Sequence, residues 1–280
     1  MPHIARVYNY WLGGKDNFAA DREMGERTIA AYPALPLSAR ANRAFLVRVV
    51  EFLADEVGIR QFLDIGTGLP TANNTHEVAQ RVAPECRIVY VDNDPIVLSH
   101  AQALLTSSRE GACAYIDADL HDPGTILDSA AETLDFGKPI AVMFLASIHF
   151  VGDLNEASAI VKRVMDACAP GSYLAISHPA IDIAAEQVAE MVRRLNETTL
   201  QKTNLRDRAS VARLFEGYDL VEPGVVRAPE WRPRSAMEAA SPAALWAGVA
   251  RKPLLGRPLR VEIAAVSDWP AVAPRKADMF

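Results

Sequence analysis

The sequence has few cysteines, no excess of positive charge and no hydrophobic run long enough to span a bilayer. Its 280 residues include three cysteines, which are far apart and lack metal-site spacing, so we expect buried thiols in a reducing compartment and no metal. Lys and Arg number 29 against 35 Asp and Glu, a net charge of −6 that argues against a broad phosphate-binding surface. The longest apolar run, residues 140–151, is too short for a membrane span, and the N-terminus has no apolar signal core. We therefore expect a cytoplasmic protein whose partner is a small molecule or a protein, rather than nucleic acid or a membrane.

From residue 59 onward, strand patterns alternate with helix patterns. Half of the residues are hydrophobic, enough for a buried core. The predicted strands and helices alternate as 61–65, 75–82, 87–91, 95–106, 113–117, 124–134, 140–145, 154–168 and 172–177. Helices near 182–195 and 209–215, strands at 218–222 and 245–250, and a loop at 227–242 follow, which gives seven strands. Such alternation predicts an α/β fold with a mostly parallel sheet and helices on both faces.

The two ends of the chain lie outside this alternation. Helical patterns cover residues 4–12, about 18–32 and 38–58, so we expect an N-terminal helical cap at 1–58. The core is then 59–252 and a proline-rich tail is 253–280, with one candidate strand at 259–266. We interpret the tail as an arm packed on the core or on a second subunit, as in a homodimer.

A glycine turn follows the first predicted strand. Residues 61–71 read QFLDIGTGLPT, and their apolar run stops at Gly66 and Gly68 before a helix that begins near Thr75. Glycine lets a ligand approach the backbone, and the following helix offers unpaired N–H groups. Asp64 comes at the carboxyl end of the strand, where open α/β sheets bind ligands. A ligand site is one interpretation, and a tight strand-to-helix turn is the other.

An acidic cluster, Asp-Asn-Asp-Pro at 92–95, follows the second predicted strand. A carboxylate at this position of a nucleotide-binding unit can accept hydrogen bonds from both hydroxyls of a ribose. The alternative is that Asp92 bonds its own backbone in a turn. Together with the glycine turn, the acid favours a nucleoside-containing ligand.

In order and spacing, these motifs resemble class I S-adenosylmethionine-dependent methyltransferases. The residues that carry the resemblance are 63–68 (LDIGTG), 91–95 (VDNDP), 118–119 (AD) and 169–174 (APGSYL). The chain is also similar to an actinobacterial S-adenosyl methyltransferase family, formerly a domain of unknown function, over roughly residues 2–252. Residues 6–18 (RVYNYWLGGKDNF) and 40–43 (RANR) carry this closer resemblance.

The resemblance implies a Rossmann-like fold and an enzyme that transfers a methyl group from S-adenosylmethionine to an unidentified, small-molecule acceptor. It further implies that Asp64 and the glycines border the methionine portion, that Asp92 takes the ribose hydroxyls and that Asp119 faces the adenine; a capped turn is the alternative for Asp119. Pro70 replaces a third glycine found in many such enzymes, which puts the shape of the loop in question. The implied cofactor-binding residues are Asp64, Gly66, Thr67, Gly68, Asp92, Asn93, Asp119, Leu120 and Ser147.

Two groups of residues are candidates for contact with the acceptor. His149 follows the fourth predicted strand and could be a general base or a histidine hydrogen-bonded at the sheet edge, since alignment alone can drive methyl transfer. The N-terminal aromatics could lie over the sulfonium, form a lid or belong to the core, and nearby polar side chains could bind a carboxylate. The candidates for the lid or substrate are Tyr10, Trp11, Asn17, Arg40 and Arg43.

Two other functions share these features. A nicotinamide-dependent oxidoreductase also uses a glycine turn and a ribose acid, but it expects a glycine near position 71, where Thr71 stands. The sequence also lacks a Tyr-x-x-x-Lys pair for proton transfer. A non-catalytic protein that binds S-adenosylmethionine or its product as a signal would carry the same binding motifs.

Overall fold

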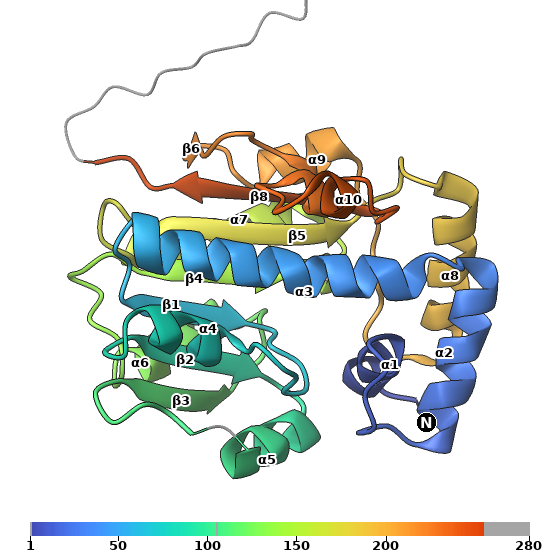
Figure 1. Cartoon of the computed structure of the whole chain (residues 1–280), viewed down its shortest axis with the longest axis horizontal. Coiled ribbons are helices and arrows are strands. Elements are labelled where there is room, and N and C mark those ends of the chain that lie inside the picture. The colour runs from blue at the N-terminus through green and yellow to red at the C-terminus, as the bar shows by residue number, and fades with distance from the viewer. Residues whose placement is uncertain (1, 105, 255–280) are drawn as a thin grey trace, which may run out of the picture.

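The computed structural model describes residues 2–104 and 106–254, which form a central sheet covered by helices (Figure 1). Within these ranges, no helix combines the length and the hydrophobicity needed to cross a membrane. The candidate strand at 259–266, and all but the first two residues of the predicted tail, lie outside the described residues.

The sheet has eight strands in the order β3-β2-β1-β4-β5-β8-β6, with β7 also paired to β8. Strands β1 to β5 run parallel, and β8 is antiparallel to β5, β6 and β7. The strands are β1 (Gln61–Ile65), β2 (Arg87–Asp92), β3 (Ala112–Asp117), β4 (Ala141–Leu145), β5 (Tyr173–Pro179), β6 (Asp219–Leu220), β7 (Val226–Arg227) and β8 (Leu245–Arg251). The predicted mostly parallel sheet is confirmed. Strand β7 was not predicted, because its two residues lie at the edge of the proline-rich segment 227–242 that we expected to be a loop.

Helices cover both faces of the sheet because successive side chains of each buried strand point to opposite faces. Leu63 packs in one apolar cluster with helices α6, α7 and α9, and Phe62 packs in another with α3, η1 and α4. The bounds are α4 (Thr75–Val82), α5 (Pro95–Leu104), α6 (Pro123–Ala130), η2 (Ile148–Phe150), α7 (Leu154–Ala167), α9 (Arg208–Arg213), η3 (Ala228–Glu230) and α10 (Ala236–Ala239).

The N-terminal helices are α1 (Ile4–Trp11), α2 (Ala19–Ala31) and α3 (Leu35–Glu51), which continues into the π-helical turn η1 (Phe52–Glu56). Helix α3 lies across one face of the sheet, whereas α1 and α2 stand with α8 (Ala185–Thr198) beyond the carboxyl ends of β1 to β5 (Figure 1). Val7, Met24 and Val188 join these three helices in a separate apolar cluster. The first three helices therefore bridge the sheet and the space beyond its strand ends, and a separate cap at 1–58 stays a prediction.

Helix α3 begins three residues before its predicted start at Ser38. Pro36 is tolerated in the first turn, because a helix needs no backbone N–H there. Ser38 lies inside the helix instead of capping it. Its hydroxyl accepts a hydrogen bond of 3.2 Å from the backbone N–H of Ala244, which ties α3 to the start of β8.

Candidate active site

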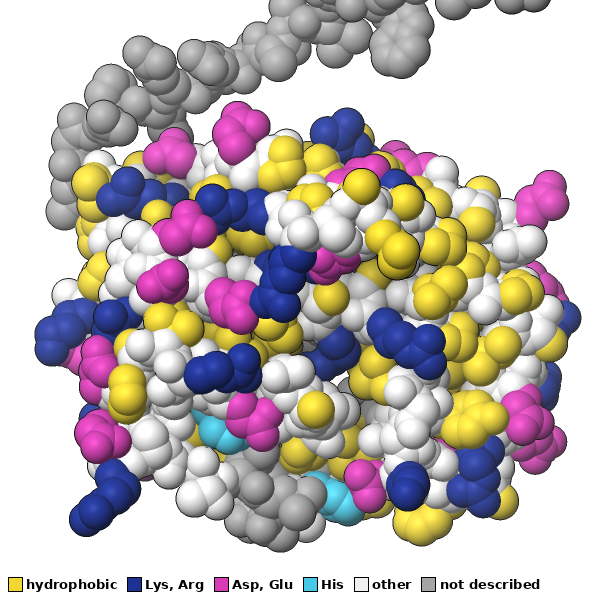
Figure 2. All heavy atoms as spheres, viewed as in Figure 1, with side chains coloured by type: hydrophobic (Ala, Val, Ile, Leu, Met, Phe, Trp, Pro, Cys, Tyr) yellow, Lys and Arg dark blue, Asp and Glu magenta, His cyan; other side chains and the backbone are white. Residues whose placement is uncertain are grey.

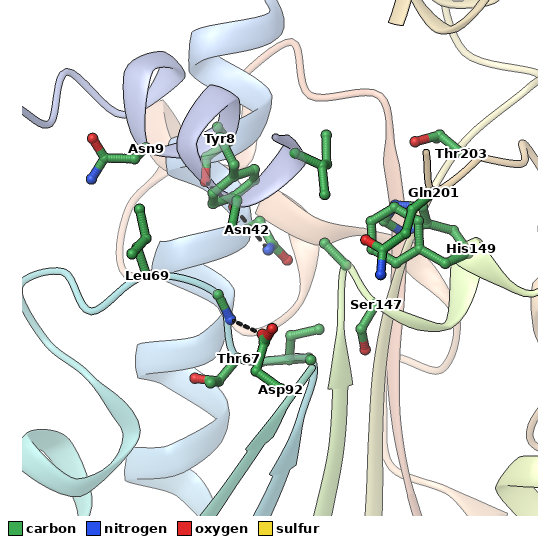
Figure 3. A pocket seen from close by; sticks show the side chains of 18 of the residues that line it. Tyr8, Asn9, Asn42, Thr67, Leu69, Asp92, Ser147, His149, Gln201 and Thr203 are labelled. Carbon is green, nitrogen blue, oxygen red and sulfur yellow. Dashed lines mark hydrogen bonds between the residues drawn. The ribbon is translucent and has the colours of Figure 1, made fainter. Parts of the chain in front are cut away.

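A pocket lies where the carboxyl ends of β1, β2 and β4 face helices α1, α3 and α8 (Figure 3). It has two halves made of different residue types. The strand-end half consists of Asp64, Gly66, Thr67, Gly68, Asp92 and Ser147. We define the helical half by Tyr8, Trp11, Leu35, Asn42, Met191 and Leu195; His3, Asn9, Ser38 and Arg43 also line this side of the pocket. His149 lies where the two halves meet, on the turn η2 that follows β4.

The glycine turn of the strand-end half requires glycine. Gly66 and Gly68 have φ angles of +78° and +67°, in the left-handed region that disfavours side chains. A Cβ atom on Gly66 would lie 2.3 Å from the Cβ of Ser147. The Ser147 hydroxyl donates a 2.6 Å hydrogen bond to the carbonyl of Ile65, so β4 holds the turn in place. A Cβ atom on Gly68 would meet no heavy atom within 4 Å.

Asp92 joins the turn to the end of β2. Its Oδ2 accepts a 2.8 Å hydrogen bond from the N–H of Gly68, and its Oδ1 accepts one of 3.0 Å from the N–H of Asp94. Burial raises the pKa of Asp92, and the two N–H donors oppose that rise. The bond from the N–H of Asp94 is the local turn bond that was the alternative interpretation of Asp92. Asp92 makes this bond and also lines the pocket. Each oxygen keeps further acceptor capacity for hydroxyl groups of a ligand.

Asp64 is the second carboxylate of the strand-end half, and it is buried. The hydroxyl of Thr75 donates a 2.7 Å hydrogen bond to its Oδ2. Burial raises the pKa of Asp64 to about 6, although Thr75 and the charge of Arg43 lower it. Arg43 lines the pocket, and its Nη2 donates to the carbonyls of residues 72 and 73 at 3.3 and 3.0 Å. A buried carboxylate of raised pKa favours a cationic group beside it.

The segment after β3 contributes Leu120 to the lining, and Asn93 after β2 lies there too. Asp119 is not among the residues that line the pocket. Its carboxylate accepts from the N–H and Nδ1 of His121 at 2.8 and 2.6 Å, and from Asn93 Nδ2 at 3.2 Å. Burial tends to raise the pKa of Asp119, but the bonds from His121 outweigh it and lower the pKa. Its adenine contact stays a prediction.

His149 is buried, and its Nδ1 has no hydrogen-bond partner among the described residues. Its ring packs edge-on against His178, 5.9 Å away. Arg206 donates a hydrogen bond of 2.7 Å to Nε2 of His178. Because Nε2 accepts, the proton of His178 is on Nδ1, which donates to the carbonyl of Pro179 at 2.9 Å. Burial, and then the neighbouring His178 and Arg206, hold the pKa of His149 well below its ordinary value. His149 is a neutral imidazole with a free buried nitrogen.

The helical half contains a hydrogen-bonded chain that the sequence did not point to. The Tyr8 hydroxyl donates to the carbonyl of Ala39 at 3.2 Å and accepts from Asn42 Nδ2 at 3.0 Å (Figure 3). The Oδ1 of Asn42 accepts 2.5 Å from the hydroxyl of Ser177 on β5. Tyr8 and Asn42 are 34 positions apart in the sequence, and Asn42 and Ser177 are 135 apart, so only the fold brings the three together.

The predicted lid residues divide between two environments. Trp11 lines the pocket, with its Nε1 donating 3.1 Å to Thr28 Oγ1. Tyr10, Asn17 and Arg40 are not among the lining residues. The Tyr10 hydroxyl bonds Glu26 on the surface, Asn17 Nδ2 donates to Asn9 Oδ1 at 2.9 Å, and Arg40 is exposed. Within the described ranges, no group of three or more His, Cys, Asp or Glu side chains could hold a metal ion.

The parallel sheet with one antiparallel strand beside β5, a glycine turn after β1 and an acid after β2 form a Rossmann-like fold with a ligand pocket at its strand ends. The chain belongs to the S-adenosyl methyltransferase family, whose model matches residues 1–253. The predicted family, fold and cofactor are confirmed, and the family separates the chain from nicotinamide-dependent oxidoreductases.

Two solved structures are similar to this chain over most of their length. A protein of the DUF574 family from Streptomyces avermitilis MA-4680 is 46% identical, with a TM-score of 0.86 over 90% of this chain and 98% of that one. A methyltransferase candidate from Thermobifida fusca YX is 41% identical, with a TM-score of 0.83 over 90% of this chain and 95% of that one.

A curated relative is more distant. The carboxy-S-adenosyl-L-methionine synthase of Trichlorobacter lovleyi is 24% identical over 160 residues, 56% of this chain. The chain spans 61% of the length of that relative.

Proposed function

We propose that the strand-end half of the pocket binds S-adenosylmethionine and that the helical half binds a small-molecule methyl acceptor. The observation that carries this proposal is the continuity of the two halves in one pocket, with His149 where they meet. When bound, the cofactor supplies an electrophilic methyl group on a positively charged sulfur. The residues of the chain then have to hold both molecules and exclude water between them.

The strand-end half fits this cofactor because it offers carboxylates and open backbone instead of phosphate-binding cations. Asp92 accepts the ribose hydroxyls, since both its oxygens lie at the end of β2 and keep acceptor capacity. Asp64 faces the amino group of the methionine portion, and Arg43, whose charge acts on Asp64, faces its carboxylate. Gly68 leaves room for the ligand beside the backbone. The adjoining residues Thr67, Asn93, Leu120 and Ser147 complete the cofactor contacts.

His149 serves the acceptor through a neutral imidazole. Because its pKa is held well below its ordinary value, the ring stays unprotonated at neutral pH and can accept a hydrogen bond from the nucleophile. A weak base is sufficient when the acceptor loses its proton only as the new bond forms. Helix α1, which carries Tyr8 and Trp11, closes this part of the pocket as a lid.

The remaining proposals concern partners and location. We propose that nucleic acid is not a substrate, because acidic and basic side chains are interspersed over the face seen in Figure 2 and the net charge is −6. The three free thiols Cys86, Cys113 and Cys168 support a reducing, cytoplasmic compartment. A homodimer stays a prediction that size measurement in solution can test.

Calorimetry tests the cofactor assignment residue by residue. We expect S-adenosylhomocysteine to bind and NADH not to bind. Asp92→Ala should weaken S-adenosylhomocysteine binding by about 2 kcal/mol, roughly 30-fold, because charged hydrogen bonds to the ribose are lost.

Asp117→Ala is the matched control, since Asp117 ends the neighbouring strand in register with Asp92 but is exposed and outside the pocket. Equal affinity for the two variants would remove Asp92 from the site. Binding of NADH in place of S-adenosylhomocysteine would overturn the cofactor assignment itself.

A further inference from the structure

The six residues that define the helical half, namely Tyr8, Trp11, Leu35, Asn42, Met191 and Leu195, carry no ionised side chain. Two further lining residues on the same side of the pocket are ionisable, His3 before α1 and Arg43 on α3. Burial raises the pKa of Tyr8, so its hydroxyl keeps its proton at neutral pH. A charged ligand group placed there would lose its hydration without gaining an opposite charge, which costs several kcal/mol. The lining therefore selects against charged acceptors.

The ionisable side chains nearest to this half either bond to other partners or are neutral. His3, just before α1, has its Nδ1 2.9 Å from Asp94 Oδ2 at the end of β2. The Nη2 of Arg43 is held by the backbone carbonyls of residues 72 and 73 on the glycine-turn side. His149 is neutral for the reasons given above. None of these groups supplies a counter-charge to a ligand between α1 and α8.

Asn42 provides one directed donor in this apolar setting. The Tyr8 hydroxyl gives its proton to Ala39, so it accepts from Asn42 Nδ2, and Ser177 occupies the amide oxygen. An amide nitrogen has two hydrogens, and the second has no partner among the described residues. Figure 3 shows the Asn42 side chain beside Tyr8, in the interior of the pocket. Asn42 is 5% exposed, so an unmatched N–H there favours a ligand that accepts it.

We propose that the methyl acceptor is an uncharged, largely apolar ring compound with a hydroxyl or carbonyl oxygen that accepts a hydrogen bond from Asn42 Nδ2. Trp11, Leu35, Met191 and Leu195 surround the ring, and His149 faces it from the side of the strand ends. This substrate class rests on the proposed function, because it assigns the second half of the same pocket. The hydrogen bonds of Asn42 with Tyr8 and Ser177 fix its amide group, so that the second N–H points toward the proposed methyl acceptor.

A matched set of three naphthalenes tests the charge requirement. 2-Naphthol, 2-naphthoate and 2-naphthylmethylamine share one ring system, and at pH 7.5 they are neutral, anionic and cationic. Each is titrated calorimetrically into the full chain saturated with S-adenosylhomocysteine. We expect 2-naphthol to bind at least about tenfold more tightly than either charged compound. Equal or tighter binding of a charged compound, or no binding of any of the three, would overturn the proposal.

Asn42→Asp tests the donor with little change in shape. It removes the free N–H and adds negative charge, so 2-naphthol affinity should fall by about tenfold or more. Asn155→Asp is the matched control, because Asn155 is exposed on α7 and lies outside the pocket. Equal 2-naphthol affinity in both variants would remove Asn42 from the acceptor site. Failure of the unmodified chain to bind S-adenosylhomocysteine would instead defeat the proposed function, so the two failures are distinguishable.

Discussion

The two halves of the pocket are built in opposite ways. The strand-end half uses a backbone turn and two carboxylates, buried Asp64 on β1 and half-buried Asp92 at the end of β2. Thr75 donates to Asp64, and the N–H of Gly68 donates to Asp92. The helical half uses mainly apolar side chains from α1, α3 and α8, and its polar chain through Tyr8, Asn42 and Ser177 joins three distant parts of the sequence. In our proposal, the strand-end half binds its ligand through charge, and the helical half selects its ligand by excluding charge.

This difference follows from what each half has to hold. A cofactor common to a whole class can be bound by a motif at adjoining strand ends, because crossovers always bring those ends together. An acceptor is bound by whatever surface the helices place opposite, so its shape and polarity depend on residues that need not be close in sequence. Changes in the first half should act on the cofactor, and changes in the second half on the acceptor.

The largest effect should come from Gly66→Ala. The new Cβ would lie 2.3 Å from Ser147 Cβ, and the φ angle of +78° adds strain of about 1–2 kcal/mol. Because Ser147 is hydrogen-bonded to Ile65, relief of the clash must shift the turn. Overpacking of this kind costs about 1–3 kcal/mol, so we expect cofactor affinity to fall on the order of 100-fold. The measurements are S-adenosylhomocysteine affinity and melting temperature.

Gly58→Ala separates strain from clash. Gly58 has a φ angle of +83°, and a Cβ there would meet no heavy atom within 4 Å. The Gly58→Ala variant should have a lower melting temperature, because of backbone strain, and unchanged cofactor affinity. Unchanged cofactor binding by Gly66→Ala would show that the turn does not hold the ligand.

An intermediate effect should come from pH through Asp64. Its pKa in the free protein is about 6, and a bound cofactor with a cationic group favours the ionised carboxylate. Protonation therefore competes with binding, and affinity should fall about tenfold between pH 7.5 and pH 5, as a pKa near 6 requires. Calorimetry across this range measures the dependence.

Asp64→Asn should remove this pH dependence and can keep the bond from Thr75, because the amide oxygen accepts it. The Asp64 contribution to the stability of the free protein should change with pH in the direction opposite to the cofactor affinity. The folded-state pKa is raised above the unfolded value, so the Asp64 contribution falls as pH rises from about 4 to 6. A pH dependence that persists in Asp64→Asn would assign it to another group, such as Asp92, whose pKa burial also raises.

The strand-end half was largely predictable because its residues follow strand patterns that are themselves visible in the sequence. Gly66, Gly68 and Asp92 were identified from their place after apolar runs, and all three line the pocket. Asp119 follows β3 in the same way, but it is not among the lining residues, and His121 and Asn93 donate to its carboxylate. Its adenine contact therefore stays a prediction.

The helical half was less predictable, because spacing identifies a helix but not what its faces meet. Trp11 and Arg43 were identified and line the pocket, whereas Tyr10 lies on a different side of α1 from Tyr8. Asn42 acquires its role only through Ser177, which is 135 residues away. One available signal was the three-residue spacing of Tyr8 and Trp11, which places both on one face of α1.

The smallest effect should distinguish the two tyrosines of α1. Tyr8→Phe removes the hydroxyl that accepts from Asn42, so the amide loses one of its two fixed contacts and its free N–H is less well aimed. We expect 2-naphthol affinity to fall about threefold to tenfold, the usual range for one neutral hydrogen bond, with no change for S-adenosylhomocysteine. Tyr10→Phe makes the same chemical change two residues, or about half a turn, further along the helix. There the hydroxyl bonds Glu26 on the surface, so the change should leave both affinities unchanged. If both variants lose acceptor affinity equally, α1 acts through its stability and not through the Tyr8 hydroxyl. A loss of cofactor affinity in Tyr8→Phe alone would mean that the helical half also holds the cofactor, and that the two halves do not divide the ligands between them.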